Sequence, residues 1–146
     1  MNYRTKKIIN ERRRNLGRTG ETLVMKHLKN KGFIDIESNY RRKYGEIDLI
    51  MENAGKLHFI EVKSVSRENF TDNNVVFDVN HETNDYRPEQ NVSAWKIRKL
   101  ARMIKTYLEE KALGDKDWQL DVAVVYLDRV NRRAIIKFLK DILINE

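Results

Sequence analysis

The stretch GEIDLIMENAGKLHFIEVKS, residues 45–64, reads as a β-hairpin whose apolar strands are interrupted by charged side chains. The strands are predicted over 44–51 and 56–65, and the turn between them is centred on Ala54 and Gly55. Charged groups rarely enter such apolar runs unless they are paired or bind a metal. The charged residues of this hairpin are therefore the first candidates for a functional site.

Three of these residues are expected to meet on one face of the hairpin. Strand side chains alternate between faces, so Glu61 and Lys63 point the same way. A symmetric turn places Asp48 opposite Glu61 and Glu46 opposite Lys63. The register predicts two acids and a lysine side by side.

Such a set suits metal-assisted hydrolysis of a phosphodiester. Two facing carboxylates repel each other, and a divalent cation removes that penalty, because Mg²⁺ takes carboxylate oxygens together with water and phosphate oxygens. Lys63 could orient or deprotonate a water, or stabilise charge on the phosphate. A solvated sheet face with cross-strand ion pairs is the alternative, and the residues alone leave both interpretations open.

Basic residues cluster in three places along a chain with a net charge of +7. Residues 1–18 carry six of these net charges, a second run lies at 41–43, and a third follows one side of a predicted helix over 93–112. Such clusters favour polyphosphate binding, with a solvated surface as the alternative. The predicted nucleic-acid contacts are Arg12, Arg13, Arg14, Arg18, Arg41, Arg42, Lys43, Lys96 and Lys99.

The remaining pattern predicts an α/β fold with a mixed sheet between helices. We expect one domain over 1–146, with a basic N-terminal arm (1–15) and a polar insert (66–92). Besides the hairpin and the helix at 93–112, the predicted elements are a helix over roughly 16–31, strands at 33–38 and 120–127, a short edge strand at 75–79, and a strand or short helix at 134–139.

The composition limits the class of protein. The chain has no cysteine, which excludes disulfides and thiolate metal sites. No apolar run approaches the ~20 residues of a membrane span, and the first residues lack the apolar core of a secretory signal. We therefore expect a cytoplasmic protein with no membrane partner.

Several other polar and aromatic residues receive structural interpretations. We expect His27, His58 and His81 to be structural or solvated, and Asp121 to be a hydrogen-bonding residue beside a turn. Trp95 and Trp118 are expected to anchor the second helix in the core, with stacking on nucleobases as the alternative.

Asp48 followed by Glu61-Val62-Lys63 resembles the D…(D/E)-x-K signature of the restriction-endonuclease-like nuclease superfamily. A finer resemblance, over roughly residues 15–127, is to the YraN family of endonuclease-like bacterial proteins. Three pieces carry it: Gly17-x-x-Gly20-Glu21, then Asn39-x-Arg41 leading to Gly45-Glu46-Ile47-Asp48-Leu49-Ile50, and Phe59-Ile60-Glu61-Val62-Lys63. The chain departs from the family pattern at Val65, where an arginine is usual.

The resemblance implies a restriction-endonuclease-like αβββαβ core. It implies that Asp48 and Glu61 bind Mg²⁺ or Mn²⁺ and that Lys63 completes the catalytic set. Glu21 would be an accessory catalytic acid, although an acid near the start of a helix is also favoured by the helix dipole. The implied activity is hydrolysis of DNA, with branched or structured DNA among the substrates, and coordinated cutting of both strands would require a homodimer. The rival interpretation is a nucleic-acid-binding module that keeps the nuclease fold without cleaving.

Overall fold

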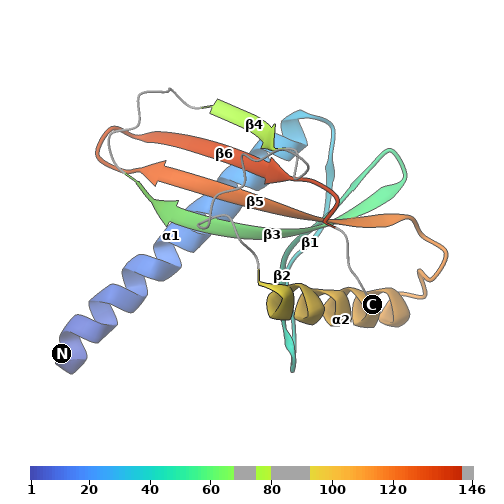
Figure 1. The fold of residues 1–146 in the computed structure, drawn as a ribbon, viewed down its shortest axis with the longest axis horizontal. Coiled ribbons are helices and arrows are strands. Elements are labelled where there is room, and N and C mark those ends of the chain that lie inside the picture. Colours follow the sequence, from blue (N-terminus) through green and yellow to red (C-terminus); the bar gives the residue numbers. More distant parts are fainter. Residues whose placement is uncertain (68–74, 80–92, 143–146) are drawn as a thin grey trace.

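The computed structural model describes residues 1–67, 75–79 and 93–142, which contain two helices and one sheet (Figure 1). In chain order the elements are α1 (Tyr3–Asn30), β1 (Ile34–Arg42), β2 (Gly45–Asn53), β3 (Lys56–Ser66), β4 (Val75–Val79), α2 (Ala94–Glu110), β5 (Trp118–Asp128) and β6 (Arg133–Leu139). The sheet order is β1-β2-β3-β5-β6-β4, with β3–β5 and β4–β6 parallel and the other neighbours antiparallel.

The mixed α/β fold predicted from the sequence is confirmed. The β1–β2–β3 meander is followed, after β4, by α2 as the crossover to the parallel strand β5. Residues 75–79 form an edge strand as predicted, and the segment at 134–139 belongs to a strand rather than a short helix. Apart from β4 and residues 66–67, the predicted insert at 66–92 lies outside the described residues, and so does His81.

Helix α1 begins far earlier than the apolar pattern predicted. The basic segment 1–15 was expected to be an arm ahead of the helix, yet helix runs from Tyr3 onward. Asn2 caps it by accepting a hydrogen bond from Thr5 N at 2.8 Å, and the arginines and lysines that follow are good helix formers. This half of α1 projects from the sheet (Figure 1). No helix of the described residues is both long and apolar enough to cross a membrane.

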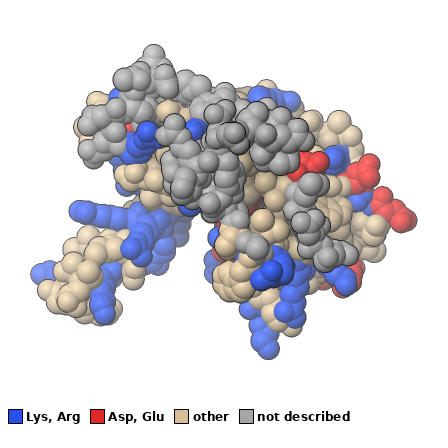
Figure 2. All heavy atoms as spheres, in the orientation of Figure 1, with Lys and Arg blue, Asp and Glu red and all other residues tan. Residues whose placement is uncertain are grey.

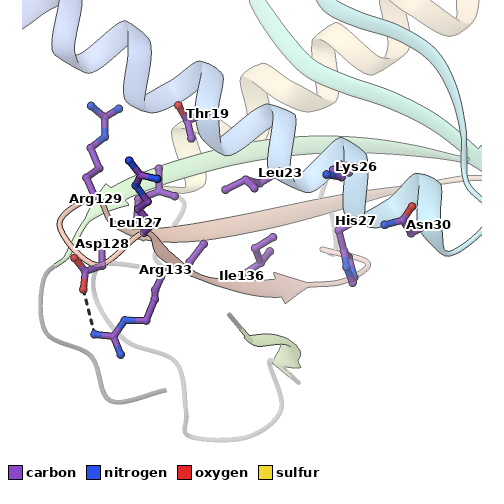
Figure 3. Close-up of a pocket in the computed structure, with 12 residues that line it drawn as sticks. Thr19, Leu23, Lys26, His27, Asn30, Leu127, Asp128, Arg129, Arg133 and Ile136 are labelled. Carbon is purple, nitrogen blue, oxygen red and sulfur yellow. Dashed lines mark hydrogen bonds and ion pairs between the residues drawn. The ribbon is translucent and has the colours of Figure 1, made fainter. Parts of the chain in front are cut away.

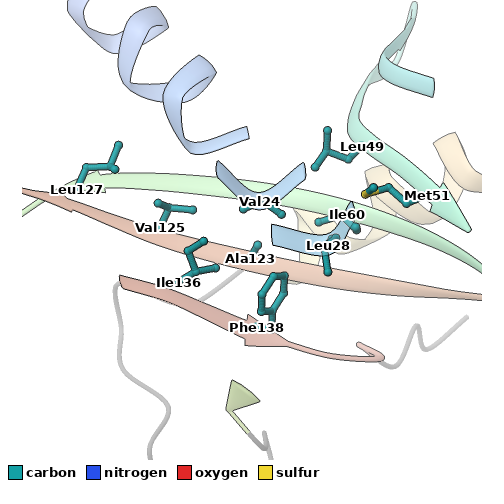
Figure 4. Packing of buried hydrophobic residues seen from close by; sticks show 10 residues of the cluster. All are labelled: Val24, Leu28, Leu49, Met51, Ile60, Ala123, Val125, Leu127, Ile136 and Phe138. Carbon is teal, nitrogen blue, oxygen red and sulfur yellow. The ribbon is translucent and has the colours of Figure 1, made fainter. Parts of the chain in front are cut away.

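The other half of α1 packs on one face of the sheet. Val24 and Leu28 are buried there among apolar side chains of β2, β3, β5 and β6, including Ile60 and Phe138 (Figure 4). The helix comes closest to β3 at Gly20, where a Cβ atom would overlap the hydroxyl of Ser64. A glycine at this position therefore sets how near α1 lies to the strand that carries Glu61.

Helix α2 covers part of the opposite face of the sheet. Its apolar side is buried against Tyr40, Ile50 and Phe59, and consists of Leu100, Met103, Ile104 and Tyr107. The first turn is fixed by Ser93, whose hydroxyl accepts a hydrogen bond from Lys96 N at 3.2 Å. The N-terminal turn of α2 lies beside the charged residues of the hairpin.

The tryptophans differ from the expectation that both would anchor α2 in the core. Trp95 is 59% exposed, so that expectation is wrong for this residue. The position faces away from the apolar stripe of the helix, and its ring carries the Lys99 ammonium at 4.0 Å from the centroid. Trp118 is also exposed, at 36%, and contacts the Phe59 ring edge-on with the ring centroids 5.9 Å apart.

The turn of the central hairpin is the one predicted. Asn53 pairs with Lys56, which leaves Ala54 and Gly55 as a two-residue loop with φ values of 51° and 77°. Two positive φ values are the geometry of a type I′ turn. The pairing then continues in the predicted register as far as Leu49 and Ile60.

Candidate metal and nucleic-acid site

The β2–β3 ladder stops one residue short of the two predicted metal ligands. Leu49 and Ile60 form the last described pair, so Asp48 and Glu61, and likewise Glu46 and Lys63, are not the ladder partners that the symmetric register predicted. Here β2 diverges from β3, and the Asp48 carboxylate accepts a hydrogen bond from Val62 N at 2.8 Å. A side-chain oxygen thus takes the place of a backbone acceptor.

Asp48 and Glu61 nevertheless line one cavity, of about 280 Å³, beneath the first turns of α2. Glu61 is only 8% exposed. Its Oε1 lies 2.7 Å from the ammonium nitrogen of Lys96, which reaches in from α2. The cavity therefore holds two inward carboxylates with a lysine as counter-ion.

The electrostatics of the cavity are unfavourable for two bare carboxylates. Burial, followed by the nearby charge of Glu61, raises the pKa of Asp48 to about 8, and the hydrogen bond from Val62 only partly opposes this. For Lys96, burial acts to lower the pKa, but the hydrogen bond and charge of Glu61 outweigh it and the pKa is raised. The site thus favours a cation beside its acids.

Glu21 and Glu46 extend the acidic region toward α1. Burial, then the charges of Glu46 and Glu61, raise the pKa of Glu21, so these carboxylates are close enough to interact. Glu46 lines the cavity of Asp48 and also a neighbouring cavity of about 600 Å³. Arg14, Arg18, Glu21 and Arg41 line that second cavity. Glu21 therefore stands at the junction between the acids and the basic side of α1.

Lys63 lies further along β3 than the cavity. It is half-buried and pairs in register with Val124 of β5. Strand alternation places it on the Glu61 side of the sheet, but the residues that line the cavity do not include it. Lys96, which had been predicted only as a nucleic-acid contact, is the lysine that lines the cavity and forms an ion pair with Glu61.

Eight of the nine predicted nucleic-acid contacts separate into three groups. Arg14, Arg18 and Arg41 surround the second cavity, whereas Lys96 and Lys99 line the first. Arg12, Arg13 and Lys43 are exposed, the first two on the projecting part of α1. Figure 2 shows Lys and Arg side chains along that projecting helix and around α2.

Arg42 differs from these residues because it joins two elements. Its guanidinium makes two hydrogen bonds to the Glu110 carboxylate, at 2.9 and 2.7 Å, and lies 4.2 Å from the Tyr40 ring centroid. The bond from Arg42 lowers the pKa of Glu110 to about 2. Arg42 thus links the end of β1 to the end of α2.

The donor set of the cavity fits a hard divalent cation. Mg²⁺ and Mn²⁺ prefer oxygen ligands, and Mg²⁺ commonly takes one or two carboxylates plus water and phosphate oxygens. Asp48 and Glu61 supply two carboxylates whose repulsion a cation would relieve. Across the described part of the chain, no group of three or more His, Cys, Asp or Glu residues is arranged to hold a metal. Water and substrate phosphate oxygens are the further ligands that Mg²⁺ commonly takes beside carboxylates.

The described histidines pack among core residues, as expected. His58 Nδ1 lies 2.8 Å from Asp121 Oδ2, and His27 stacks on Phe138 with ring centroids 5.8 Å apart. Asp121 also accepts hydrogen bonds from Gln119 Nε2 and Asp141 N, which ties the segment after β6 to β5. This carboxylate is a structural hydrogen bonder and does not line the cavity of Asp48 and Glu61.

A larger cavity, of about 620 Å³, lies between α1 and the β5–β6 turn (Figure 3). Its one lining carboxylate, Asp128, is buried and already bonded to Asn131 and Arg133. A single engaged acid does not provide the donor set of a metal site. The larger cavity therefore lacks the ligands of a metal site, whereas the smaller cavity contains two carboxylates.

Two functional candidates escaped sequence reasoning. Glu46 was placed opposite Lys63 but lines both the cavity of Asp48 and the second cavity, and the pairing of Lys96 with Glu61 was not foreseen. The G-E-I-D spacing could have indicated Glu46, two residues before Asp48. Nothing local in the sequence indicates the Lys96 contact, because it depends on how the crossover from β3 returns α2 to the sheet.

Comparison with known proteins identifies relatives over most of the chain. The profile of "Uncharacterised protein family UPF0102" matches residues 20–125. A UPF0102 protein of Moorella thermoacetica is 30% identical over 88% of this chain and 94% of its own length. UPF0102 proteins of Clostridium botulinum (33% identity, 88% and 93%) and Campylobacter fetus (33% identity, 78% and 86%) are similar in extent. The matched region contains Glu21, Asp48, Glu61, Lys63 and Lys96.

Proposed function

The chain belongs to the uncharacterised protein family UPF0102, the YraN family to which its motifs pointed, and we propose that it is a Mg²⁺- or Mn²⁺-dependent endonuclease acting on DNA. Branched or structured DNA is the substrate form that we favour. A non-catalytic nucleic-acid-binding module with the same fold is the alternative. We expect a cytoplasmic protein, and a homodimer only if both strands are cut together.

One observation carries the proposal: the Asp48 and Glu61 carboxylates share a cavity in which Lys96 is the counter-ion. Carboxylates buried together are costly unless a cation accompanies them. A protein that needed only packing at this place could use apolar residues of similar volume. A role of the two acids in binding a cation therefore explains their presence better than a contribution to the stability of the fold.

Asp48 and Glu61 would hold the metal, and the remaining residues would act on the substrate. The metal would supply Lewis-acid stabilisation of the phosphate and a more acidic water. Lys63, on the same strand face as Glu61, would stabilise the charge that develops on the phosphate. Glu21 would add a further acid from α1, beside Glu46.

Basic side chains would bring the DNA backbone to these acids. Arg14, Arg18 and Arg41 line the cavity next to Glu46, and Lys99 lines the cavity of Asp48 itself. Arg and Lys contacts to phosphates provide affinity without sequence readout. The proposed substrate path therefore runs from α1 across the acids to α2.

A cleavage assay tests the proposal directly. Purified protein is incubated with linear, flapped and four-way DNA in Mg²⁺, Mn²⁺ or EDTA, and products are resolved on denaturing gels. We expect metal-dependent cutting that Asp48→Asn and Glu61→Gln abolish. Glu52→Gln is the matched control, because Glu52 is an acid of the same hairpin that pairs with Lys116 at 2.7 Å, outside the cavity.

The two functions give different outcomes in the same assay. Salt-sensitive DNA binding with no cutting in any metal would establish the binding module. Cutting that survives in Asp48→Asn and Glu61→Gln would show a contaminating nuclease. If the protein neither binds nor cuts any of the DNA forms, both the nuclease and the binding module are rejected.

A further inference from the structure

Trp95 is a large aromatic side chain exposed at the edge of the acidic cavity. It is 59% exposed and lines the same cavity as Asp48, Glu61 and Lys96. Single exposed apolar residues are common on protein surfaces and need no explanation by themselves. Trp95 does require an explanation, because it lies beside two carboxylates at a proposed phosphate site.

The local structure holds Trp95 in place. Its backbone belongs to the first turn of α2, which the Ser93 side chain caps through Lys96 N. Lys99, one turn later, places its ammonium 4.0 Å from the ring centroid. The ring therefore carries a positive charge on one face.

A second tryptophan provides the contrast. Trp118 is the only other tryptophan of the chain, and its ring packs edge-on against Phe59. It does not line the cavity of Asp48. The chain thus has one tryptophan that packs against Phe59 and one that lines the cavity of the acids.

Such a ring can stack only on a base whose face is free. In duplex DNA both faces of each base are covered by neighbouring base pairs, whereas an unpaired or extruded base offers its face to an aromatic side chain. Lys96 and Lys99, which line the same cavity as this ring, would supply phosphate contacts beside it. The arrangement suits a nucleotide that is unpaired next to the bound phosphate.

We propose that Trp95 is a stacking platform for an unpaired nucleobase adjacent to the phosphate held at Asp48 and Glu61. The substrate class is then DNA with single-stranded character at the site, such as a flap or an open junction, rather than continuous duplex. This inference rests on the proposed nucleic-acid function, and it concerns binding rather than hydrolysis.

Fluorescence in the absence of metal tests the stacking separately from cleavage. In a Trp118→Phe background, Trp95 is the sole tryptophan. We expect its emission to be quenched by a single-stranded oligonucleotide and by a flap, but not by a blunt duplex of the same sequence. Equal quenching by the blunt duplex, or none by the single strand, would overturn the proposal.

Affinity measurements add an independent readout. Stacking on an aromatic side chain is worth about 10- to 100-fold in affinity per base, so Trp95→Ala should weaken single-strand and flap binding by that factor and leave duplex binding unchanged. Trp95→Phe should retain most of the affinity, and Trp118→Phe should have no selective effect. An abasic nucleotide at the stacked position should weaken wild type but not Trp95→Ala.

The outcomes separate this inference from the proposed function. If Trp95→Ala selectively loses affinity for single strands and flaps while wild type cleaves no DNA, the stacking platform is kept and the nuclease is rejected. If wild type cleaves duplex and flap equally in the presence of metal, and Trp95→Ala changes neither reaction, the nuclease is kept and the stacking platform is rejected. Equal loss of duplex and single-strand affinity would reduce Trp95 to a nonselective contact and also overturn the proposal.

Discussion

The Lys96 ammonium forms a 2.7 Å ion pair with Glu61, inside the cavity that Asp48 also lines. The lysine therefore occupies the position of a cation beside a proposed metal ligand. A metal ion that binds Glu61 would be repelled by this ammonium, even if it used the other carboxylate oxygen. The ion pair connects α2, the helix that carries the proposed DNA contacts, to the proposed metal site.

Replacing Lys96 with methionine should strengthen metal binding. Removing the competing positive charge leaves the carboxylates more negative, so the rise in melting temperature caused by Mn²⁺ should be larger than in wild type. Without metal, the variant should melt lower, because Glu61 loses its partner while nearly buried. Differential scanning fluorimetry with a metal titration measures both effects.

Lys105→Met is the control for this experiment, since Lys105 is exposed on the same helix and does not line the cavity. It should leave the metal response unchanged. A smaller metal response in Lys96→Met than in wild type would show that Lys96 supports metal binding instead of competing with it.

The stability of the metal-free protein should fall as pH rises toward 8. Asp48 has a pKa of about 8 in the folded protein against an ordinary value of 3.8, so the folded state binds more protons between these values. The free energy of unfolding then decreases with pH across that window and levels off above it. Asp48→Asn should lack this decrease, because an amide does not titrate and its oxygen can still accept from Val62 N.

Urea unfolding at pH 5, 6.5 and 8 in EDTA provides the measurement. Glu52→Gln serves as the control and should keep the wild-type pH dependence. At pH 8, Asp48→Asn should be at least as stable as wild type. A marked loss of stability there would mean that the carboxylate is needed for structure.

Two glycines of α1 should respond oppositely to alanine. A Cβ atom at Gly20 would overlap Ser64 of β3, so Gly20→Ala should destabilise the fold by about 1–3 kcal/mol, the usual cost of overpacking. A Cβ atom at Gly17 meets no atom within 4 Å, so Gly17→Ala should stabilise the helix by roughly 0.5–1 kcal/mol. Chemical denaturation gives both values, and equal effects at the two positions would refute the close approach of α1 to β3.

The projecting half of α1 should control the salt dependence of DNA binding. The first buried residue of the helix is Gly20, so deleting residues 1–14 leaves the packed part intact. For each phosphate that the shortened protein no longer neutralises, the slope of log affinity against log salt should become shallower by about 0.9 on duplex DNA. Fluorescence anisotropy at several salt concentrations measures the slope, with Lys29→Gln at the far end of α1 as control. An unchanged slope after the deletion would mean that this segment is merely solvated.

The hairpin could be predicted because its signals are local. Alternation of apolar residues and the Ala54-Gly55 turn fix the register, and the structure follows it from the turn to Leu49 and Ile60. Beyond that pair the prediction fails, because the backbones diverge and the Asp48 side chain takes over a hydrogen bond. Strand periodicity carries no information about where a ladder ends.

The surroundings of the hairpin were harder to foresee. The start of α1 lacks an apolar stripe, so periodicity missed a helix that capping and propensity produce. Trp95 was assigned to the core because tryptophan is usually buried, and the partner of Lys96 is set by the return of α2 to the sheet. These contacts arise from the tertiary structure and leave no pattern in the nearby sequence.

The role of Lys63 can be separated from that of Lys96 by comparing binding with turnover. Lys63 lies outside the cavity lining, on the Glu61 side of β3, and its proposed role is to stabilise charge on the bound phosphate. A donor that stabilises charge present only in the transition state affects turnover more than affinity, typically by ~10²–10³ in rate. Lys63→Ala and Lys63→Arg should both bind DNA within a few-fold of wild type and fail to cut it. Arginine should not rescue, since its planar, permanently charged fork does not imitate a compact ammonium.

Single-turnover cleavage alongside anisotropy titration gives the two quantities for each variant. Lys105→Met, which changes an exposed lysine away from the cavity, should match wild type in both. Near-normal cleavage by Lys63→Ala, under conditions where Asp48→Asn is inactive, would remove Lys63 from the mechanism. The lysine of the D…(D/E)-x-K signature would then be structural, and Lys96, the ammonium already in contact with Glu61, would be the remaining candidate for its catalytic role.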